Sequence, residues 1–379
     1  MKVASFLYQH QDFTKEINEE QLSIKDASLV IGFGAGVLVS DAFHYNAIRK
    51  KFPNAVLAIA SSAGEIFGKE VFDHTISLVA MQFEDTKIAT AEVSIEDFST
   101  SFEAGKALVT QLPKAQLKLI FVLSDGGKVN GSELVKGINE ATDNKILVTG
   151  GLAGDGTKFE KTYVGLNQVP TSGKIIAIGF YGEKLQVSHG SIGGWESFGL
   201  ERTVTKSDKN ILYEIDHKNV LDLYKTYLGK YANDLPGSAL LFPLSIKVNE
   251  SEDVIVRTIL SIDEQKQSMT FAGDLPIGSK VRFMKANFDR LIDAASDAAN
   301  HCLKMNTTSP KVALLISCVG RKVILNNRID EEVEAVSDIF NNTTLLTGFY
   351  SYGEISPLHP FSDCELHNQT MTITCLNEL

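Results

Sequence analysis

The feature that most constrains the fold is a pattern that occurs three times: a strand, a helix, a second strand and a Gly-containing turn. Its last two parts read "LAIASSAGEI" (57–66), "LVTGGLAGDG" (147–156) and "LLTGFYSYGEI" (345–355). Glycine at the end of a strand permits positive φ and close backbone approach. Ligands in α/β proteins tend to bind beyond strand ends. The pattern therefore predicts repeated α/β units whose turns line a shared site or a domain interface.

Each copy of the pattern has its own apolar strands and helix. The predicted elements are residues 29–39, 40–52 and 55–60 in the first copy, 117–127, 131–142 and 145–156 in the second, and 311–323, 330–340 and 344–355 in the third. In the third copy, residues 311–323 are predicted as a strand followed by a turn. Ser40 and Ser132 precede or open helical stretches and are predicted N-caps.

A segment of different character, residues 186–290, separates the second and third copies. It is rich in Gly, Ser and aromatic residues and contains a predicted helix at 219–229 that ends at Gly229. A longer helix is predicted at 288–304. The predicted fold is α/β, with two domains, residues 1–198 and 199–379, and mixed β-sheets built from repeated strand-turn-helix-strand units.

Composition limits the partners of the chain. Its 379 residues carry a net charge of −11, with 44% hydrophobic and 22% charged residues, so phosphate backbones and anionic lipid surfaces are disfavoured partners. The longest apolar stretch, residues 29–39, is about half of what a membrane-spanning helix needs, and the N-terminus has no signal-peptide pattern. The four cysteines form no CxxC pair, which favours a reduced, cytoplasmic setting.

The repeated turns supply the candidate residues for a small-ligand site. They are Ser61, Ser62, Gly64 and Glu65 in the first turn, Gly151, Gly154 and Asp155 in the second, and Arg321, Ser351, Tyr352, Gly353 and Glu354 in the third copy. An arginine and turn amides bind carboxylates, and acidic side chains bind ammonium groups, so this set predicts an amino-acid-like ligand. The alternative is structural: Arg321 would form an ion pair with Glu354 or Glu65 and hold the loops.

The chain resembles the FIST sensory proteins, which pair an N-terminal and a C-terminal FIST domain. The resemblance rests on an ordered set: "SSAGEI", "GGLAGDG", "VTKSDKNILYEID", "FAGDLPIG", "SCVGR" and "GFYSYGEI". It covers essentially the whole chain. It implies a bacterial protein that binds a small ligand and signals through a partner. Since the sequence contains no kinase, cyclase or DNA-binding module, that partner must be another protein, and a homodimer is compatible with the sequence.

The segment 188–205 resembles the NosP-type nitric-oxide sensors within this family. That resemblance implies haem b held by a histidine, nitric oxide as the signal, and a histidine kinase or cyclic-di-GMP enzyme as the partner. His189 is the predicted iron ligand, because it lies where a strand meets a Gly-rich loop, and Trp195 and Phe198 are predicted to wall the pocket. The alternatives are a hydrogen-bonded loop histidine and a FIST sensor without haem.

An enzymatic role has weaker support. Cys318 lies at a predicted strand end, a position that suits a nucleophile. However, no histidine lies at a telling spacing from it, and neither a G-x-S-x-G turn nor a phosphate-binding loop is present. The expected function is therefore sensory rather than enzymatic.

Overall fold

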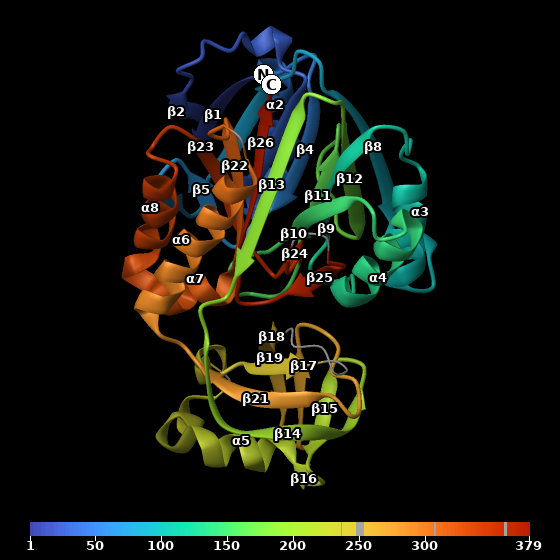
Figure 1. Cartoon of the computed structure of the whole chain (residues 1–379), viewed down its shortest axis with the longest axis vertical. Coiled ribbons are helices and arrows are strands. Elements are labelled where there is room, and N and C mark those ends of the chain that lie inside the picture. Colours follow the sequence, from blue (N-terminus) through green and yellow to red (C-terminus); the bar gives the residue numbers. More distant parts are fainter. Residues whose placement is uncertain (236, 248–253, 307, 360–361) are drawn as a thin grey trace.

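The computed structural model describes residues 1–235, 237–247, 254–306, 308–359 and 362–379. They form a large body of three β-sheets and a smaller domain attached at one end of it (Figure 1). Both chain termini lie at the opposite end of the body. There the ammonium group of Met1 lies 3.2 Å from the carboxylate of Glu378.

Each sheet of the body has six strands. The order in the first sheet is β11 (Val164–Leu166), β4 (Val56–Ser61), β3 (Leu29–Gly34), β7 (Ile76–Gln82), β1 (Lys2–Gln9) and β2 (Asp12–Ile17). The order in the second is β25 (Cys364–His367), β24 (Gly353–Pro357), β10 (Leu147–Leu152), β9 (Leu117–Ser124), β12 (Lys174–Tyr181) and β8 (Lys87–Ser94). The order in the third is β6 (Glu70–Phe72), β5 (Glu65–Phe67), β23 (Leu345–Ser351), β22 (Val312–Cys318), β26 (Met371–Glu378) and β13 (Leu185–Ile192).

The three sheets share one plan. Each contains one parallel pair, β3 with β4, β9 with β10, and β22 with β23, and the strands on either side of the pair run antiparallel to it. Each pair is the strand–helix–strand repeat recognised in the sequence. The predicted α/β fold with mixed sheets built from a repeated unit is therefore confirmed, and the body consists of three such units.

The units are joined by a cyclic exchange of strands. After its turn, the first unit sends β5 to pair with β23 of the third unit. The third unit sends β24 to pair with β10 of the second, and the second sends β11 to pair with β4 of the first. Because each unit completes the sheet of another, the turns that precede these strands meet near the centre of the body.

Helices cover the outer faces of the sheets. They are α1 (Gly36–Val39) and α2 (Ala42–Lys51) in the first unit, α3 (Ser101–Thr110) and α4 (Gly131–Thr142) in the second, and α6 (Phe288–Met305), α7 (Val319–Leu325) and α8 (Ile329–Ile339) in the third. The inner faces form one apolar core to which all three sheets contribute, for example through Ile31, Phe121 and Ile316. Phe33 and Phe349 stack across this core with ring centroids 4.5 Å apart.

The helices α2, α4, α6 and α8 lie where the sequence predicts them, but the residues that cap α2 and α4 differ from the predicted ones. The carboxylate of Asp41 caps α2 and the amide oxygen of Asn130 caps α4. Ser40 instead donates its hydroxyl to the carbonyl of Gly36, and Ser132 lies within the first turn of α4. The predicted turn after β22 is the helix α7, which brings Lys322 towards the first unit.

The smaller domain is inserted between β13 and α6 of the third unit. It contains β14 (Glu196–Asp208), β15 (Ile211–Ile215), β16 (Lys218–Asn219), α5 (Val220–Leu228), β17 (Leu244–Lys247), β18 (Ile255–Arg257), β19 (Ile259–Asp263), β20 (Ser268–Phe271) and β21 (Lys280–Lys285). Short 3-10 helices occur at Ile24–Asp26, Ile95–Asp97, Gly229–Asp234, Gly237–Leu241 and Asn326–Arg328. The predicted boundary between residues 198 and 199 lies inside β14.

Candidate functional site

The three turns are joined by a ring of backbone hydrogen bonds. In each, an amide of one unit donates to a carbonyl of another: Ala63 to Tyr350 at 2.8 Å, Gly154 to Ser61 at 3.1 Å, and Tyr352 to Leu152 at 3.1 Å. This ring explains why the chain repeats the turn. Each turn closes the junction between its own unit and the next.

Glu65 holds the first turn from inside. It is 1% exposed, and its carboxylate accepts hydrogen bonds from the hydroxyl of Ser62 and from both the backbone amide and the hydroxyl of Thr75, the last two at 3.1 and 2.9 Å. Burial raises the pKa of Glu65 to about 7, although its three hydrogen bonds act in the opposite direction.

Glu354 holds the third turn in the same way. It is fully buried and accepts from the hydroxyl of Ser351 at 2.7 Å and from the amide and hydroxyl of Thr370 at 3.1 and 2.9 Å. Burial likewise raises its pKa to about 7. The predicted ligand residues Ser351 and Glu354 therefore hold the turn rather than face a cavity.

The second turn departs from this plan. In the first and third turns, the glutamate lies two residues after the residue whose amide donates the hydrogen bond of the ring. In the second turn that position is Gly156, and a loop of residues 155–163 precedes β11. Asp155 organises this loop, because its carboxylate accepts from the backbone amides of Phe159, Glu160 and Lys161 at 2.8–2.9 Å. Asp155 thus differs in role from Glu65 and Glu354, with which the sequence groups it.

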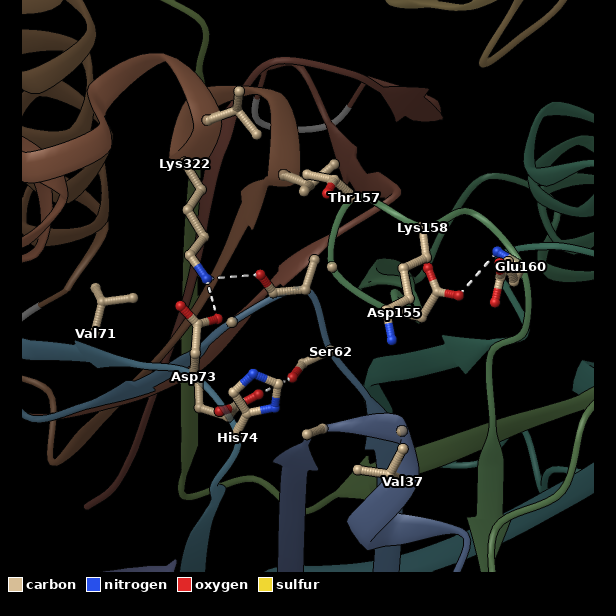
Figure 2. Close-up of a pocket in the computed structure, with 18 of the residues that line it drawn as sticks. Val37, Ser62, Val71, Asp73, His74, Asp155, Thr157, Lys158, Glu160 and Lys322 are labelled. Atoms are coloured by element: carbon tan, nitrogen blue, oxygen red, sulfur yellow. Dashed lines mark hydrogen bonds and ion pairs between the residues drawn. The ribbon is translucent and has the colours of Figure 1, made fainter.

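The loop forms one wall of a cleft of about 710 Å³ at the junction of the three units. Figure 2 shows Asp155, Lys158 and Glu160 on one side and Lys322 and Asp73 on the other. This volume is typical of small-molecule sites. The second turn therefore continues into a loop that forms a wall of the cleft. In the first and third turns, a buried glutamate and a strand follow instead.

Lys322 of α7 is the best-anchored cation in the cleft. Its ammonium group donates to the carbonyl of Ala63 at 2.9 Å and pairs with Asp73, and its side chain is 18% exposed. A Cβ added at Gly64 would lie 2.5 Å from the same nitrogen, so glycine is needed for this approach. An ammonium group has three donors, and two of those of Lys322 have these partners.

Other charged side chains line the opposite wall. Lys158, Glu160 and Lys161 are exposed and belong to the loop, and the ammonium group of Lys161 lies 5.2 Å from the ring centroid of Tyr163. His74, also exposed, adds a polar ring to the first unit's side. The cleft therefore presents cations and carboxylates side by side.

Arg321, the predicted carboxylate-binding residue, lies away from the cleft. It is fully buried, and its guanidinium forms an ion pair with Glu332, with Nε to Oε1 at 2.7 Å. Its remaining donors bind the carbonyls of Gly193 at 2.5 Å and Leu291 at 2.6 Å. The structural alternative is thus the observed one, but the partner is Glu332 rather than Glu354 or Glu65.

His189, the predicted iron ligand, is 4% exposed on β13. It is paired with Thr374 of β26, and Thr374 is paired with Leu314 of β22, a residue of the central core. Because residues paired across antiparallel strands share a face, His189 lies on the core face of its sheet. Burial, with a smaller contribution from His301, lowers the pKa of His189 to about 4. The neutral ring keeps a lone pair, and its Nδ1 has no partner among the described residues.

The surroundings of His189 do not fit a haem. A Cβ added at Gly190 would lie 2.1 Å from the carbonyl of Ala298, so this glycine admits helix α6 rather than a macrocycle. The indole of Trp195 donates to the carbonyl of Gln369 at 2.9 Å, and Phe198 packs in the smaller domain against Phe283. The three predicted haem contacts therefore lie in separate packing environments and do not form one pocket.

Two further residues have structural surroundings. Cys318 is 2% exposed, and burial raises the pKa of its thiol, so a thiolate nucleophile is disfavoured there. A Cβ at Gly151 would lie 2.8 Å from the side chain of Ile316, so this glycine permits close packing. Within the described ranges, no group of three or more His, Cys, Asp and Glu side chains could hold a metal ion, and no helix is long and apolar enough to cross a membrane.

The structure therefore brings together only part of the predicted ligand set. Ser62, Gly64, Glu65 and Asp155 line the cleft, and Tyr352 supports its wall. The sequence reasoning missed Asp73, Lys158, Lys161 and Lys322. Lys322 directly follows Arg321, the last residue of "SCVGR", and Lys158 and Lys161 come just after "GGLAGDG". The charged residues next to these motifs were therefore the sequence feature that could have indicated the cleft.

The fold and the cleft are those of an α/β protein with a cavity of small-molecule size. A comparison with protein families matches residues 28–218 to the FIST N domain and residues 221–357 to the FIST C domain. The chain therefore belongs to the FIST family and has a ligand-binding sensory role. The matched regions meet between β16 and α5, inside the inserted domain.

No curated protein matches the sequence. Among solved structures, the cyanuric acid hydrolase from A. caulinodans is similar over 95% of this chain and 92% of its own, with 8% identity and a TM-score of 0.36. A second cyanuric acid hydrolase covers 100% and 99%, with 10% identity and a TM-score of 0.34. Likeness at this level carries no argument about chemistry.

Proposed function

We propose that this protein is a sensor whose cleft at the junction of the three units binds a small zwitterionic ligand of the amino-acid type. The observation that carries the proposal is the pairing of charges in the cleft. Lys322, Lys158 and Lys161 offer ammonium groups to an anionic end, and Asp73 and Glu160 offer carboxylates to a cationic end. A zwitterion satisfies both, whereas an ion of one sign meets repulsion on one side.

The placement of the cleft supports a sensory role. Its walls come from the first unit (Asp73), the second unit (Lys158) and the third unit (Lys322). A ligand that contacts all three favours one arrangement of the units over another, which is how binding shifts a conformational population. The partner that would read this arrangement, a histidine kinase or a cyclic-di-GMP enzyme, is inferred from the NosP-type resemblance of residues 188–205 alone.

The test is isothermal titration calorimetry of the purified chain with L-alanine, L-glutamate and L-lysine, which differ in side-chain charge. Ethylamine and propionate serve as probes with only one charged end. We expect one of the amino acids to bind, and both single-charge probes to bind at least tenfold more weakly. Binding of none of the amino acids, or equal binding of propionate, would overturn the proposal.

A matched pair of variants locates the site. Lys322→Met removes the anchored ammonium group, whereas Lys128→Met removes an exposed lysine that pairs with Glu96 outside the cleft. Hydrogen bonds to charged groups contribute about 1.5–3 kcal/mol, so Lys322→Met should weaken binding by about 10- to 100-fold. Lys128→Met should leave it unchanged. Equal affinity in both variants would place the ligand elsewhere.

A further inference from the structure

Tyr352 belongs to the third unit, but its side chain contacts the loop of the second. Its phenol oxygen hydrogen-bonds to the carboxylate of Asp155, donates towards the carbonyl of Gly156 at 3.2 Å, and accepts from the amides of Asp155 and Phe159 at 3.1 and 3.2 Å. Its ring stacks on that of Phe159 with centroids 4.5 Å apart. One side chain therefore contacts both the start and the middle of the loop.

The loop depends on this anchor because few of its other groups are held. Thr157, Lys158, Phe159, Glu160 and Lys161 are all exposed, and Phe159 has a positive φ of 55°. Apart from the hydrogen bonds to Asp155, the contacts of Tyr352 are the ones that fix the path of the backbone at Phe159. Lys158 and Lys161 flank that residue.

We propose that Tyr352 is a positioning residue of the ligand site. By binding the Asp155 carboxylate, its hydroxyl orients the group to which the amides of Phe159, Glu160 and Lys161 donate, and so sets where Lys158 and Lys161 meet the ligand. This inference rests on the proposed function, since it assigns those lysines to the same ligand. It also makes the second unit's wall of the cleft depend on the docking of the third unit.

The test compares Tyr352→Phe with Tyr181→Phe. Both changes remove one phenol oxygen and keep the ring, and Tyr181 is a matched control because its buried hydroxyl has no hydrogen-bond partner among the described residues. Hydrogen exchange of the amides of residues 159–161 is measured without ligand. We expect about tenfold faster exchange in Tyr352→Phe and wild-type rates in Tyr181→Phe. Unchanged exchange in Tyr352→Phe would overturn the inference.

Titration with the amino acid that binds the wild-type chain supplies the second readout. We expect Tyr352→Phe to weaken binding about 5- to 30-fold, while its melting temperature stays close to that of Tyr181→Phe. A purely structural role of Tyr352 would instead lower the melting temperature together with the affinity. Equal affinities of the two variants would overturn the positioning role alone. If the wild-type chain binds none of L-alanine, L-glutamate and L-lysine, the proposed function itself fails, whatever the exchange rates are.

Discussion

Glu65 and Glu354 occupy matching positions in two different units and have the same partners. Each accepts a hydrogen bond from a serine three residues before it and two from a single threonine, Thr75 or Thr370. Each is almost completely shielded from water. The repeated Gly-Glu-Ile turn is thus a buried brace in two of the three units, and the second unit, which lacks it, instead contributes the loop that forms one wall of the cleft.

The first prediction concerns pH. Burial raises the pKa of both carboxyls to about 7 from a usual 4.5, so between these values the folded state binds more protons than the unfolded chain. The contribution of each group to the free energy of unfolding is therefore full below pH 4.5 and declines as the pH rises towards 7. His189 and His367, with pKa values lowered to about 4, act in the opposite direction.

Because these effects oppose each other, the measurement is a difference between variants. Urea unfolding of Glu65→Gln and of the wild-type chain is compared at pH 5, 6, 7 and 8. We expect the variant to gain about 1–3 kcal/mol relative to wild type as the pH rises. Glu201→Gln, at an exposed position, is the control and should show a constant difference. A constant difference for Glu65→Gln would contradict the prediction.

The second prediction separates a structural role of Arg321 from ligand binding. Arg321→Met leaves the buried carboxylate of Glu332 with the hydroxyls of Ser317 and Tyr350 as its partners. Breaking a buried ion pair costs about 3–5 kcal/mol, and Arg321→Met combined with Glu332→Leu should recover much of that loss. Ligand affinity of the folded fraction should stay at the wild-type value. Chemical unfolding and calorimetry check both points, and a selective loss of affinity would return Arg321 to the ligand site.

The third prediction concerns the closest backbone approach in the third unit. A Cβ added at Gly348 would lie 1.8 Å from the carbonyl oxygen of Leu315 on the neighbouring strand. Gly348→Ala should therefore cost about 3 kcal/mol or more, because the parallel strands must separate. Gly127→Ala is the control, since its added Cβ would lie 3.7 Å from its nearest neighbour, a carboxylate oxygen of Asp125. Thermal unfolding that is equal for the two variants would show that the strands can separate at little cost.

The fourth prediction addresses haem. Since His189 is 4% exposed and Trp195 and Phe198 pack in other surroundings, we expect the visible spectrum of haemin with the protein to match that of free haemin. His189→Ala should leave that spectrum unchanged. A sharp Soret band at one haem per chain that moves on adding nitric oxide and disappears in His189→Ala would establish the haem site and require the central core beside β13 to open.

The local elements and their repetition could be predicted from the amino-acid pattern. The apolar strands, the helices and the glycine turns follow from periodicity and from residues such as Gly348, whose lack of a side chain is a local property. Helix starts were less certain, because Asp41, Ser40, Asn130 and Ser132 are all good capping residues and backbone geometry decides among them.

Which turn residues are buried and which face the cleft depends on how the three units pack together. Arg321 and Lys322 are neighbours in sequence, yet one is sealed against Glu332 and the other extends to Ala63 of another unit. That choice depends on the cyclic exchange of strands, which brings together residues hundreds of positions apart. Pattern and spacing carry no information on such contacts, since the energies of burial and pairing arise only when the three sheets close around one core.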